Sequence, residues 1–296
     1  MRIEEIVAYL TSKEIEYEYK GNKGFEIKTF SNLSKIEANS VCWIKTKKYA
    51  TEDVVCKLRE KCDVLVVSPF YIEGVNCIIS KYPKGIFFDI LNRFFSKEMV
   101  HEISERAIIL TKRIGCNVHV GANCYIGEDV VIGDNTVIHP NVNIICPCKI
   151  GHNCEIYPGV VIGADGFGYY FENDVPYREK HVMGVEIGNY VDIGSNTCID
   201  RGVITNTVIK DHVKIDNLCH IGHNVVIEEN SLVIAGTIIC GSALIKKNAY
   251  LSPGSVVLNQ IIVEEKGKVG SNSLAISRVK EGTTVFGVPG KCITGQ

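Results

Sequence analysis

Two histidines three residues apart are the residues of this chain best suited to chemistry. His220 and His223 stand in "IDNLCHIGHNVVIEE", residues 215–229, among aliphatic and turn residues. Imidazole changes charge near neutral pH and therefore serves as a general base, a general acid or a metal ligand. A shared metal is not expected, because side chains alternate along a strand and no Cys, Asp or Glu stands at ligand spacing beside the pair. Catalysis by one histidine and simple packing are the two interpretations that remain.

Thiols are the other group with possible chemistry. The chain contains 13 cysteines, an odd number that is scattered along the sequence, so reduced thiols are favoured over a disulfide framework. Cys146 and Cys148 form the one close pair and have no second pair at zinc-site spacing. We therefore predict no metal site.

These residues lie within a repeat of six. Isoleucine or valine recurs at every sixth position from Ile114 to Ile162, at Ile187, Ile193 and Ile199, and, after a slip of four residues, from Ile209 to Val269, where Leu251 takes one of the positions. A second small or β-branched residue follows each aliphatic residue by four positions, as Val118, Cys124 and Val130 do. Glycine often stands directly after the aliphatic residue. Several cysteines are thus explained as small apolar fillers of a narrow interior.

A short fixed period predicts a solenoid, and hexapeptide repeats form a parallel β-helix. Three hexads, about 18 residues, make one triangular coil, and coils stack about 4.8 Å apart through backbone hydrogen bonds. We expect the aliphatic residue to fill the corner of the prism and the following glycine to make the tight turn.

The repeat occupies only part of the chain, which we divide into three segments. Residues 1–100 lack it and predict a small α/β domain, with an amphipathic helix from Ile3 to Leu10, a buried strand at 62–68 and a helix at 85–95. Residues 101–275 form the predicted β-helix, and residues 276–296 a short C-terminal segment. The expected fold class is mainly β.

Breaks in a solenoid are where function usually loops out. The larger break is "GADGFGYYFENDVPYREKHVMGV", residues 163–185, and the smaller is "DRGVITNT", residues 200–207. Phe167, Tyr169 and Tyr170 are costly to expose, so they predict a ligand or another chain facing the loop, against the simpler interpretation of a solvated loop. Neither break matches a nucleotide-phosphate loop.

Charge and segment composition exclude some partners. Lys and Arg number 32 and Asp and Glu 34, a formal net charge of −2, so no overall attraction to nucleic acid or anionic membrane is expected. The N-terminus mixes acidic with apolar residues, so neither a signal peptide nor a transmembrane segment is predicted, and we expect a cytoplasmic protein.

The combination of "IGADGFGY" (162–169), "IDRG" (199–202) and "IDNLCHIGHNV" (215–225) resembles the LpxD family, the UDP-3-O-(3-hydroxyacyl)glucosamine N-acyltransferases of lipid A biosynthesis. The resemblance implies a left-handed coil. It also implies transfer of a 3-hydroxyacyl chain from an acyl carrier protein thioester to the 2-amine of a UDP-3-O-acylglucosamine. No cofactor is bound, because the donor carries its own phosphopantetheine, and the chains form a homotrimer whose sites are completed by the next chain.

The resemblance also implies site residues. His223 is the general base, and His220 its neighbour. Gly241, one coil further on, offers a backbone N–H to the oxyanion, although a plain turn glycine is the alternative. Trp43 and Tyr49 sandwich the uracil, Gln260 replaces a second histidine near the sugar phosphates, and Phe167 of the larger break contacts substrate.

Other functions stay open beside this one. The ending "VFGVPGKCITGQ" lacks the helical extension of many LpxD-like chains and resembles that of acetyltransferases which use acetyl-CoA, with Gly290 replacing alanine and Lys291 near the cofactor phosphates. An acetyl-CoA-dependent N-acetyltransferase on a nucleotide-linked amino sugar is therefore the main alternative. An O-acyltransferase, a β-helix scaffold and a γ-carbonic-anhydrase-like hydratase are less favoured. The sequence does not define the acyl chain length.

Overall fold

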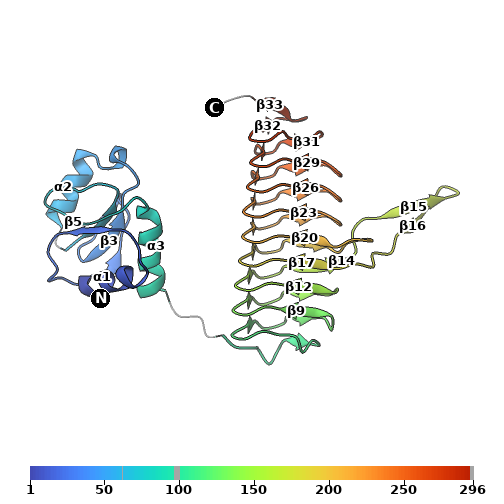
Figure 1. The fold of residues 1–296 in the computed structure, drawn as a ribbon, viewed down its shortest axis with the longest axis horizontal. Coiled ribbons are helices and arrows are strands. Elements are labelled where there is room, and N and C mark those ends of the chain that lie inside the picture. The colour runs from blue at the N-terminus through green and yellow to red at the C-terminus, as the bar shows by residue number, and fades with distance from the viewer. Residues whose placement is uncertain (62, 97–100, 294–296) are drawn as a thin grey trace. The chain divides into compact units, whose positions relative to one another are not determined.

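The computed structural model describes residues 1–61, 63–96 and 101–293. The chain divides into two compact units, Met1–Met99 and Val100–Gln296 (Figure 1). Each unit has its own buried core, and each is described here by itself.

The N-terminal unit is a five-stranded sheet with helices on both faces. Its strands follow the order β1-β5-β4-β3-β2, and only β1 runs antiparallel to its neighbour. The elements are α1 (Ile3–Ser12), β1 (Glu18–Lys20), β2 (Thr29–Phe30), β3 (Ser40–Trp43), the 3-10 helix η1 (Lys47–Tyr49), α2 (Glu52–Glu60), β4 (Leu65–Ser68), β5 (Asn76–Ile79) and α3 (Pro83–Phe94).

The alternation of side chains along the strands explains the two faces of this sheet. Val41, Leu65 and Val67 point to the face covered by α1 and α3, whereas Cys42 and Val66 point to the face covered by α2. The predicted helices at the N-terminus and at 85–95 are present, and the predicted strand at 62–68 begins at Leu65, with residue 62 outside the described part. The unit is α/β.

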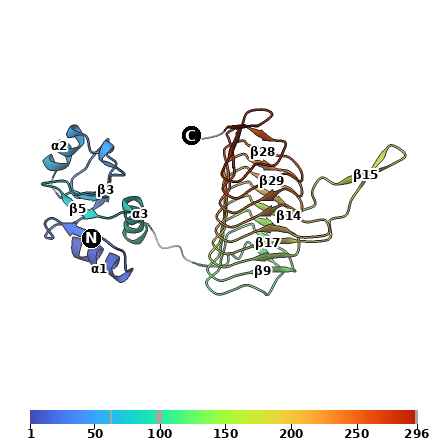
Figure 2. The ribbon, with the colours of Figure 1, turned by 45° about the horizontal axis from the view of Figure 1, so that its top comes forward.

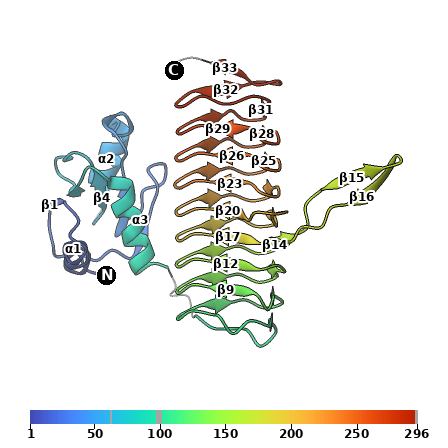
Figure 3. The same cartoon turned by 45° about the vertical axis from the view of Figure 1, so that its right-hand side comes forward.

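The second unit stacks three parallel sheets into a solenoid (Figures 2 and 3). The first sheet contains β7 (His119–Val120), β10 (Val137–Ile138), β13 (Glu155–Ile156), β18 (Asp192–Ile193), β21 (Lys214–Ile215), β24 (Leu232–Val233), β27 (Tyr250–Leu251), β30 (Lys268–Val269), β32 (Thr284–Phe286) and the antiparallel β33 (Lys291–Ile293). The second contains β6 (Ile108–Ile109), β8 (Tyr125–Ile126), β11 (Asn143–Ile144), β14 (Val161–Ala164), β19 (Cys198–Asp200), β22 (His220–Ile221), β25 (Ile238–Ile239), β28 (Val256–Val257) and β31 (Leu274–Ala275). The third contains β9 (Val130–Ile132), β12 (Cys148–Ile150), β17 (Val185–Ile187), β20 (Thr207–Ile209), β23 (Val226–Ile227), β26 (Leu244–Ile245) and β29 (Ile262–Val263).

The register of the strands confirms the predicted coil. Ile138 pairs with Ile156 and Ile221 with Ile239, an offset of 18 residues in each case. The aliphatic residues of the repeat and their small partners four positions later, including Cys124, Cys148 and Cys154, fill the interior. The fold class is mainly β, a left-handed parallel β-helix of hexapeptide repeats.

The turn residue of the repeat differs from the prediction. Glycines after the aliphatic residue, such as Gly121 and Gly133, do not have positive φ; the left-handed conformation falls two residues later, at Asn123 (φ 60°) and Asn135 (φ 56°). Asparagine tolerates this conformation better than most residues. The glycines are needed because a Cβ on Gly133 would lie 2.6 Å from the carbonyl carbon of Gly151 in the next coil. Glycine thus allows coils to stack closely, and asparagine makes the corner.

Both predicted breaks interrupt the stack as insertions. The strand offset rises to 37 residues across the first, where Cys148 pairs with Val185, and to 22 residues across the second, where Cys198 pairs with His220. Within residues 163–185, here called the inserted arm, β15 (Tyr169–Glu172) and β16 (Val175–Arg178) form an antiparallel hairpin that projects from the solenoid (Figures 1 and 3).

None of the helices in the described residues is long and apolar enough to cross a membrane.

Candidate functional site

His223 lies at a corner of the solenoid with its ring held in one tautomer. Its Nδ1 is 2.9 Å from Oδ1 of Asn224. Asn224 donates from Nδ2 to the Thr205 carbonyl oxygen at 2.8 Å, which fixes Oδ1 as the acceptor facing His223. Because an amide oxygen only accepts, Nδ1 of His223 carries the proton and Nε2 keeps a lone pair. The ring is therefore prepared to accept a proton at Nε2.

Gly241 lies against that nitrogen from the next coil. A Cβ built on Gly241 would be 2.6 Å from Nε2 of His223, and the Ser242 N–H donates to the His223 carbonyl at 2.8 Å. The structure thus brings together the two residues that the sequence placed one coil apart. Only glycine leaves room for the imidazole here.

The backbone N–H of Gly241 is free within the described part of the chain. At equivalent corners the N–H groups of Cys116, Ser195 and Lys247 donate to a side chain of a neighbouring coil. The corner at Gly241 therefore retains a donor for a ligand.

His223 and Gly241 open onto a cavity of about 420 Å³. Its wall also includes Gln260 and Phe167, the two substrate-contacting residues predicted for this unit, and Phe167 is 88% exposed. His220 lines the same cavity, which corrects the expectation that the two histidines point apart. Alternation holds along a straight strand, but β22 ends at Ile221 and His223 lies in the turn that follows, next to Asn224 (φ 60°).

Sequence reasoning missed two residues of this site, Asp200 and His181. Asp200 is 7% exposed, and its Oδ2 is 3.6 Å from Nε2 of His220. His181, which belongs to the larger break at 163–185, is buried with its ring centroid 5.3 Å from that of His223. The four-residue insertion supplied a usable signal for Asp200, since an offset of 22 places it beneath Gly222, between the two histidines.

Burial changes the acid–base properties of the cavity. It raises the pKa of Asp200, an effect that the neighbouring His220, His223 and His181 oppose and that Asp165 reinforces. Burial also raises the pKa of the Cys240 thiol on the cavity wall, so this thiol is a poor nucleophile. Among the described residues, no three His, Cys, Asp or Glu side chains are grouped to hold a metal ion.

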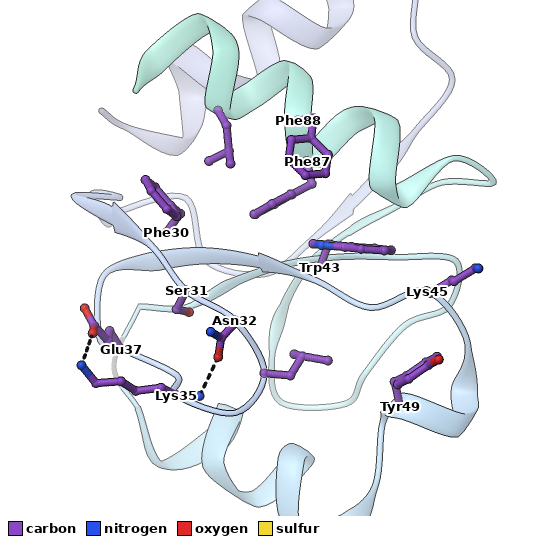
Figure 4. Close-up of a pocket in the computed structure, with 12 residues that line it drawn as sticks. Phe30, Ser31, Asn32, Lys35, Glu37, Trp43, Lys45, Tyr49, Phe87 and Phe88 are labelled. Atoms are coloured by element: carbon purple, nitrogen blue, oxygen red, sulfur yellow. Dashed lines mark hydrogen bonds and ion pairs between the residues drawn. The ribbon is translucent and has the colours of Figure 1, made fainter. Parts of the chain in front are cut away.

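A second cavity, of about 690 Å³, lies in the N-terminal unit. Trp43 and Tyr49 both line it, together with Phe30, Phe87 and Lys45 (Figure 4). Trp43 comes from the end of β3, and its ring centroid is 6.4 Å from that of Phe87 on α3. Tyr49 ends η1 and is 52% exposed. Flat aromatic faces with a free edge are suited to stacking on a nucleobase.

The polar side of this cavity carries ordered charges. Lys35 and Glu37 form an ion pair at 3.2 Å, and the backbone N–H of Lys35 donates to Oδ1 of Asn32 at 2.9 Å (Figure 4). Lys45 lines the cavity with its side chain exposed. One side is thus apolar and aromatic, and the other offers amide, carboxylate and ammonium groups.

The fold and site define a hexapeptide-repeat β-helix protein with a histidine centre at one corner. In agreement, the sequence profile of the bacterial transferase hexapeptide (six repeats) family matches residues 111–146 and 129–164. The resemblance predicted from the motifs is also confirmed: the chain is related to proteins named UDP-3-O-acylglucosamine N-acyltransferase.

Three such relatives illustrate the similarity. The Herminiimonas arsenicoxydans protein is 37% identical over 143 residues, 48% of this chain and 41% of that protein. The second enzyme of this name from Legionella pneumophila (strain Paris) is 52% identical over 93 residues, 31% of this chain and 27% of that protein. A probable mitochondrial enzyme of Arabidopsis thaliana is 40% identical over 146 residues, 49% of this chain and 48% of that protein. The chain thus spans about half or less of the length of these relatives.

Solved structures share the β-helix. LpxA from Bacteroides fragilis, a UDP-N-acetylglucosamine acyltransferase, has a TM-score of 0.59 and 26% identity, covering 65% of this chain and 74% of that one. LpxA from Acinetobacter baumannii has a TM-score of 0.59 and 22% identity, covering 64% of this chain and 73% of that one, and shows the fold alone.

Proposed function

We propose that the protein is an N-acyltransferase that moves a 3-hydroxyacyl chain from an acyl carrier protein thioester to the 2-amine of a UDP-3-O-acylglucosamine. The single observation that carries the proposal is His223, whose Nδ1 donates to Asn224 and whose Nε2 lies against Gly241 at an open cavity. The relatives named UDP-3-O-acylglucosamine N-acyltransferase support the choice of acceptor and acyl transfer.

The reaction is a direct transfer. The amine nitrogen attacks the thioester carbonyl carbon, a C–N bond forms, and the carbonyl oxygen becomes an oxyanion that the Gly241 N–H stabilises. Nε2 of His223 takes the proton that the nitrogen must lose, an effect typically worth 10²–10⁴-fold. As the C–S bond breaks, the imidazolium returns this proton to the departing thiolate, so the enzyme ends unchanged. Cys240, a thiol with a raised pKa, has no role as nucleophile.

The N-terminal cavity is the proposed site for the nucleotide. Trp43 and Tyr49 would hold the uracil between flat faces, each stacked face contributing about 1–3 kcal/mol. Lys45 on the same wall would face the negative phosphates. Gln260, on the wall of the His223 cavity, offers the sugar neutral hydrogen bonds.

We also propose a homotrimer as the active form, acting in the cytoplasm, where nucleotide sugars and acyl carriers are available. The exposed aromatic residues of the inserted arm support association, since Phe167, Phe171 and Tyr170 are 88%, 70% and 47% exposed. A surface of this kind is stabilised by burial against another chain.

An acetyl-CoA-dependent N-acetyltransferase is the second candidate. The segment that suggests it forms the terminal hairpin of the solenoid, in which Phe286 pairs with Lys291. A lysine in this place is suited to a cofactor phosphate. The donor therefore has to be decided by assay.

The assay offers two pairs of substrates. UDP-3-O-acylglucosamine with hydroxyacyl carrier protein is compared with a UDP-linked amino sugar and acetyl-CoA, for wild type and His223→Ala. We expect turnover with the first pair and a loss of roughly 10²–10⁴-fold in kcat in the variant. Turnover that survives the substitution would remove His223 from the mechanism, and turnover with the second pair alone would select the second candidate.

A further inference from the structure

Three imidazoles surround one buried carboxylate. The charges that act on Asp200 belong to His220, His223 and His181 and, with the opposite effect, to Asp165. His223 is the proposed base and becomes an imidazolium when it takes the proton of the amine. A negative charge on Asp200 would stabilise this imidazolium. The mechanism above leaves Asp200 without a role.

Both ends of the inserted arm, at 164–166 and at 181–183, lie over the Asp200 carboxylate or the segment next to it. A Cβ built on Gly166 would be 3.0 Å from Oδ2 of Asp200, 3.1 Å from Cδ2 of His223 and 3.2 Å from Nε2 of His181. The rings of His181 and His223 meet edge to face at 88°. Asp200, His223 and His181 therefore surround Gly166, and any side chain at position 166 would displace these three side chains.

Backbone hydrogen bonds fix the arm in this position. The Arg201 N–H donates to the Ala164 carbonyl at 2.9 Å, and the Val182 and Met183 N–H groups donate to Val203 and Gly202 at 3.0 and 3.1 Å. Backbone hydrogen bonds thus hold both ends of the arm against the segment that follows Asp200. The arm is therefore kept next to the carboxylate by the backbone of the solenoid itself.

His181 lies beside Asp200, and its two ring nitrogens have different surroundings. Nδ1 of His181 lies 3.1 Å from the Glu179 carbonyl oxygen, which only accepts, so Nδ1 carries the proton. Nε2 is buried and has no hydrogen-bond partner among the described residues. In the described part of the chain, no hydrogen bond therefore joins the ring of His181 to the carboxylate, and the charge of Asp200 acts on all three histidines. Exclusion of water strengthens that interaction.

We propose that Asp200 is a positioning residue that stabilises the imidazolium formed on His223 during acyl transfer, and that Gly166 and His181 of the inserted arm seal it from water. Asp200 acts through space, since Nδ1 of His223 donates to Asn224. It takes no proton in the cycle: the proton stays on Nε2 of His223 until it passes to the leaving thiolate. This inference rests on the proposed function.

The test compares Asp200→Asn with Asp200→Glu and with Asp192→Asn. Asp192 pairs with Lys214 at 2.9 Å on another sheet and serves as the matched control. We expect Asp200→Asn to lower kcat by roughly 10- to 100-fold, because loss of an opposite charge close to the imidazolium is typically worth about one pKa unit or more, with KM unchanged. The acidic limb of the kcat profile should move to lower pH, and Asp200→Glu should restore part of both. A loss of kcat that is equal at every pH, with the acidic limb of the kcat profile unmoved, would mean a merely structural role for Asp200 and overturn the proposal.

A substrate-free measurement separates this inference from the proposed function. Diethylpyrocarbonate modifies only unprotonated imidazole, so the rate of His223 modification at pH 6 relative to pH 8, followed by mass spectrometry, reports the protonation of this ring. Asp200→Asn should raise that ratio, and His181→Ala should raise it less. An unchanged ratio overturns the proposal, whereas failure of the wild type to turn over the acylated UDP-sugar, with the ratio raised, overturns only the proposed function.

Stability provides the control for folding. Because burial raises the pKa of Asp200, the folded chain binds this proton more tightly than the unfolded chain does. The contribution of Asp200 to stability is therefore full below its unfolded pKa of about 4 and falls as the pH rises through the folded pKa. Asn does not ionise, so Asp200→Asn removes this fall in stability with rising pH. The variant is therefore expected to keep or raise Tm at pH 7. A lower Tm would assign the loss of activity to unfolding.

Discussion

At the scale of single residues, the site depends on an amide and a glycine as much as on a histidine. Asn224 accepts from Nδ1 of His223 and so decides which nitrogen is free, and its own amide is held by Thr205. Gly241 decides where that nitrogen lies. Neither residue is reactive, yet together they make His223 the only ring of the pair with a fixed tautomer and an open Nε2.

The first prediction concerns Gly241. Gly241→Ala puts a methyl group within 2.6 Å of Nε2 of His223, a contact that the ring must relieve by turning away. A displacement of about 1 Å costs on the order of 10²-fold in rate, so kcat should fall by at least that factor while Tm changes little. Gly85→Ala, whose added Cβ meets no atom within 4 Å, is the control. Wild-type kcat in Gly241→Ala would contradict the site geometry.

At the scale of elements, the two breaks in the repeat build the site. The four-residue break brings Asp200 beneath the histidines, and the inserted arm brings Gly166, Phe167 and His181 over them. The hairpin of β15 and β16 extends beyond what the site requires, and its tip remains exposed. This excess is the part of the arm that we assign to contact between chains.

The second prediction tests that assignment. Phe171 and Tyr177 are 70% and 44% exposed at the hairpin, and burial of such a side chain is worth about 1.5–3 kcal/mol. The double variant Phe171→Ser, Tyr177→Ser should therefore dissociate to monomers at higher concentration than wild type in sedimentation velocity. Tyr82→Ser, which removes a 77% exposed ring from the N-terminal unit, is the control. Identical dissociation of wild type and double variant would place the arm outside the interface.

At the scale of the whole molecule, two units with separate cores divide the proposed task. The N-terminal unit holds the aromatic cavity and the solenoid holds the histidine cavity. Separate cores allow the units to unfold in separate steps, because no single cooperative core includes both. A ligand that binds one unit then stabilises that unit.

The third prediction follows. UDP alone should raise the melting temperature of one of two calorimetric transitions. At a UDP concentration 100 times its Kd, binding stabilises the unit that holds the nucleotide by about 2.7 kcal/mol. Trp43→Ala should remove most of that shift and leave the other transition unchanged. His223→Ala should retain the shift, because it alters only the other unit. A shift that survives Trp43→Ala would exclude the aromatic cavity as the nucleotide site.

The sequence by itself determined the solenoid, because every sixth residue must enter the same narrow interior and periodicity along the chain records that directly. It also determined the pairing of His223 with Gly241, since a constant coil of 18 residues converts sequence distance into contact. The turn was assigned to the wrong residue, because glycine serves both tight turns and close approaches, and only coordinates distinguish the two uses.

The tertiary structure alone decided which other histidines lie beside His223. His181 reaches it from the far end of an insertion whose path no repeat records, and His220 joins it because the chain turns at a corner, where strand alternation ends. Ring tautomers depend on hydrogen bonds of about 3 Å, which spacing does not define. A repeat fixes positions along its own axis, and the contacts made by residues that leave the repeat are set by packing in three dimensions.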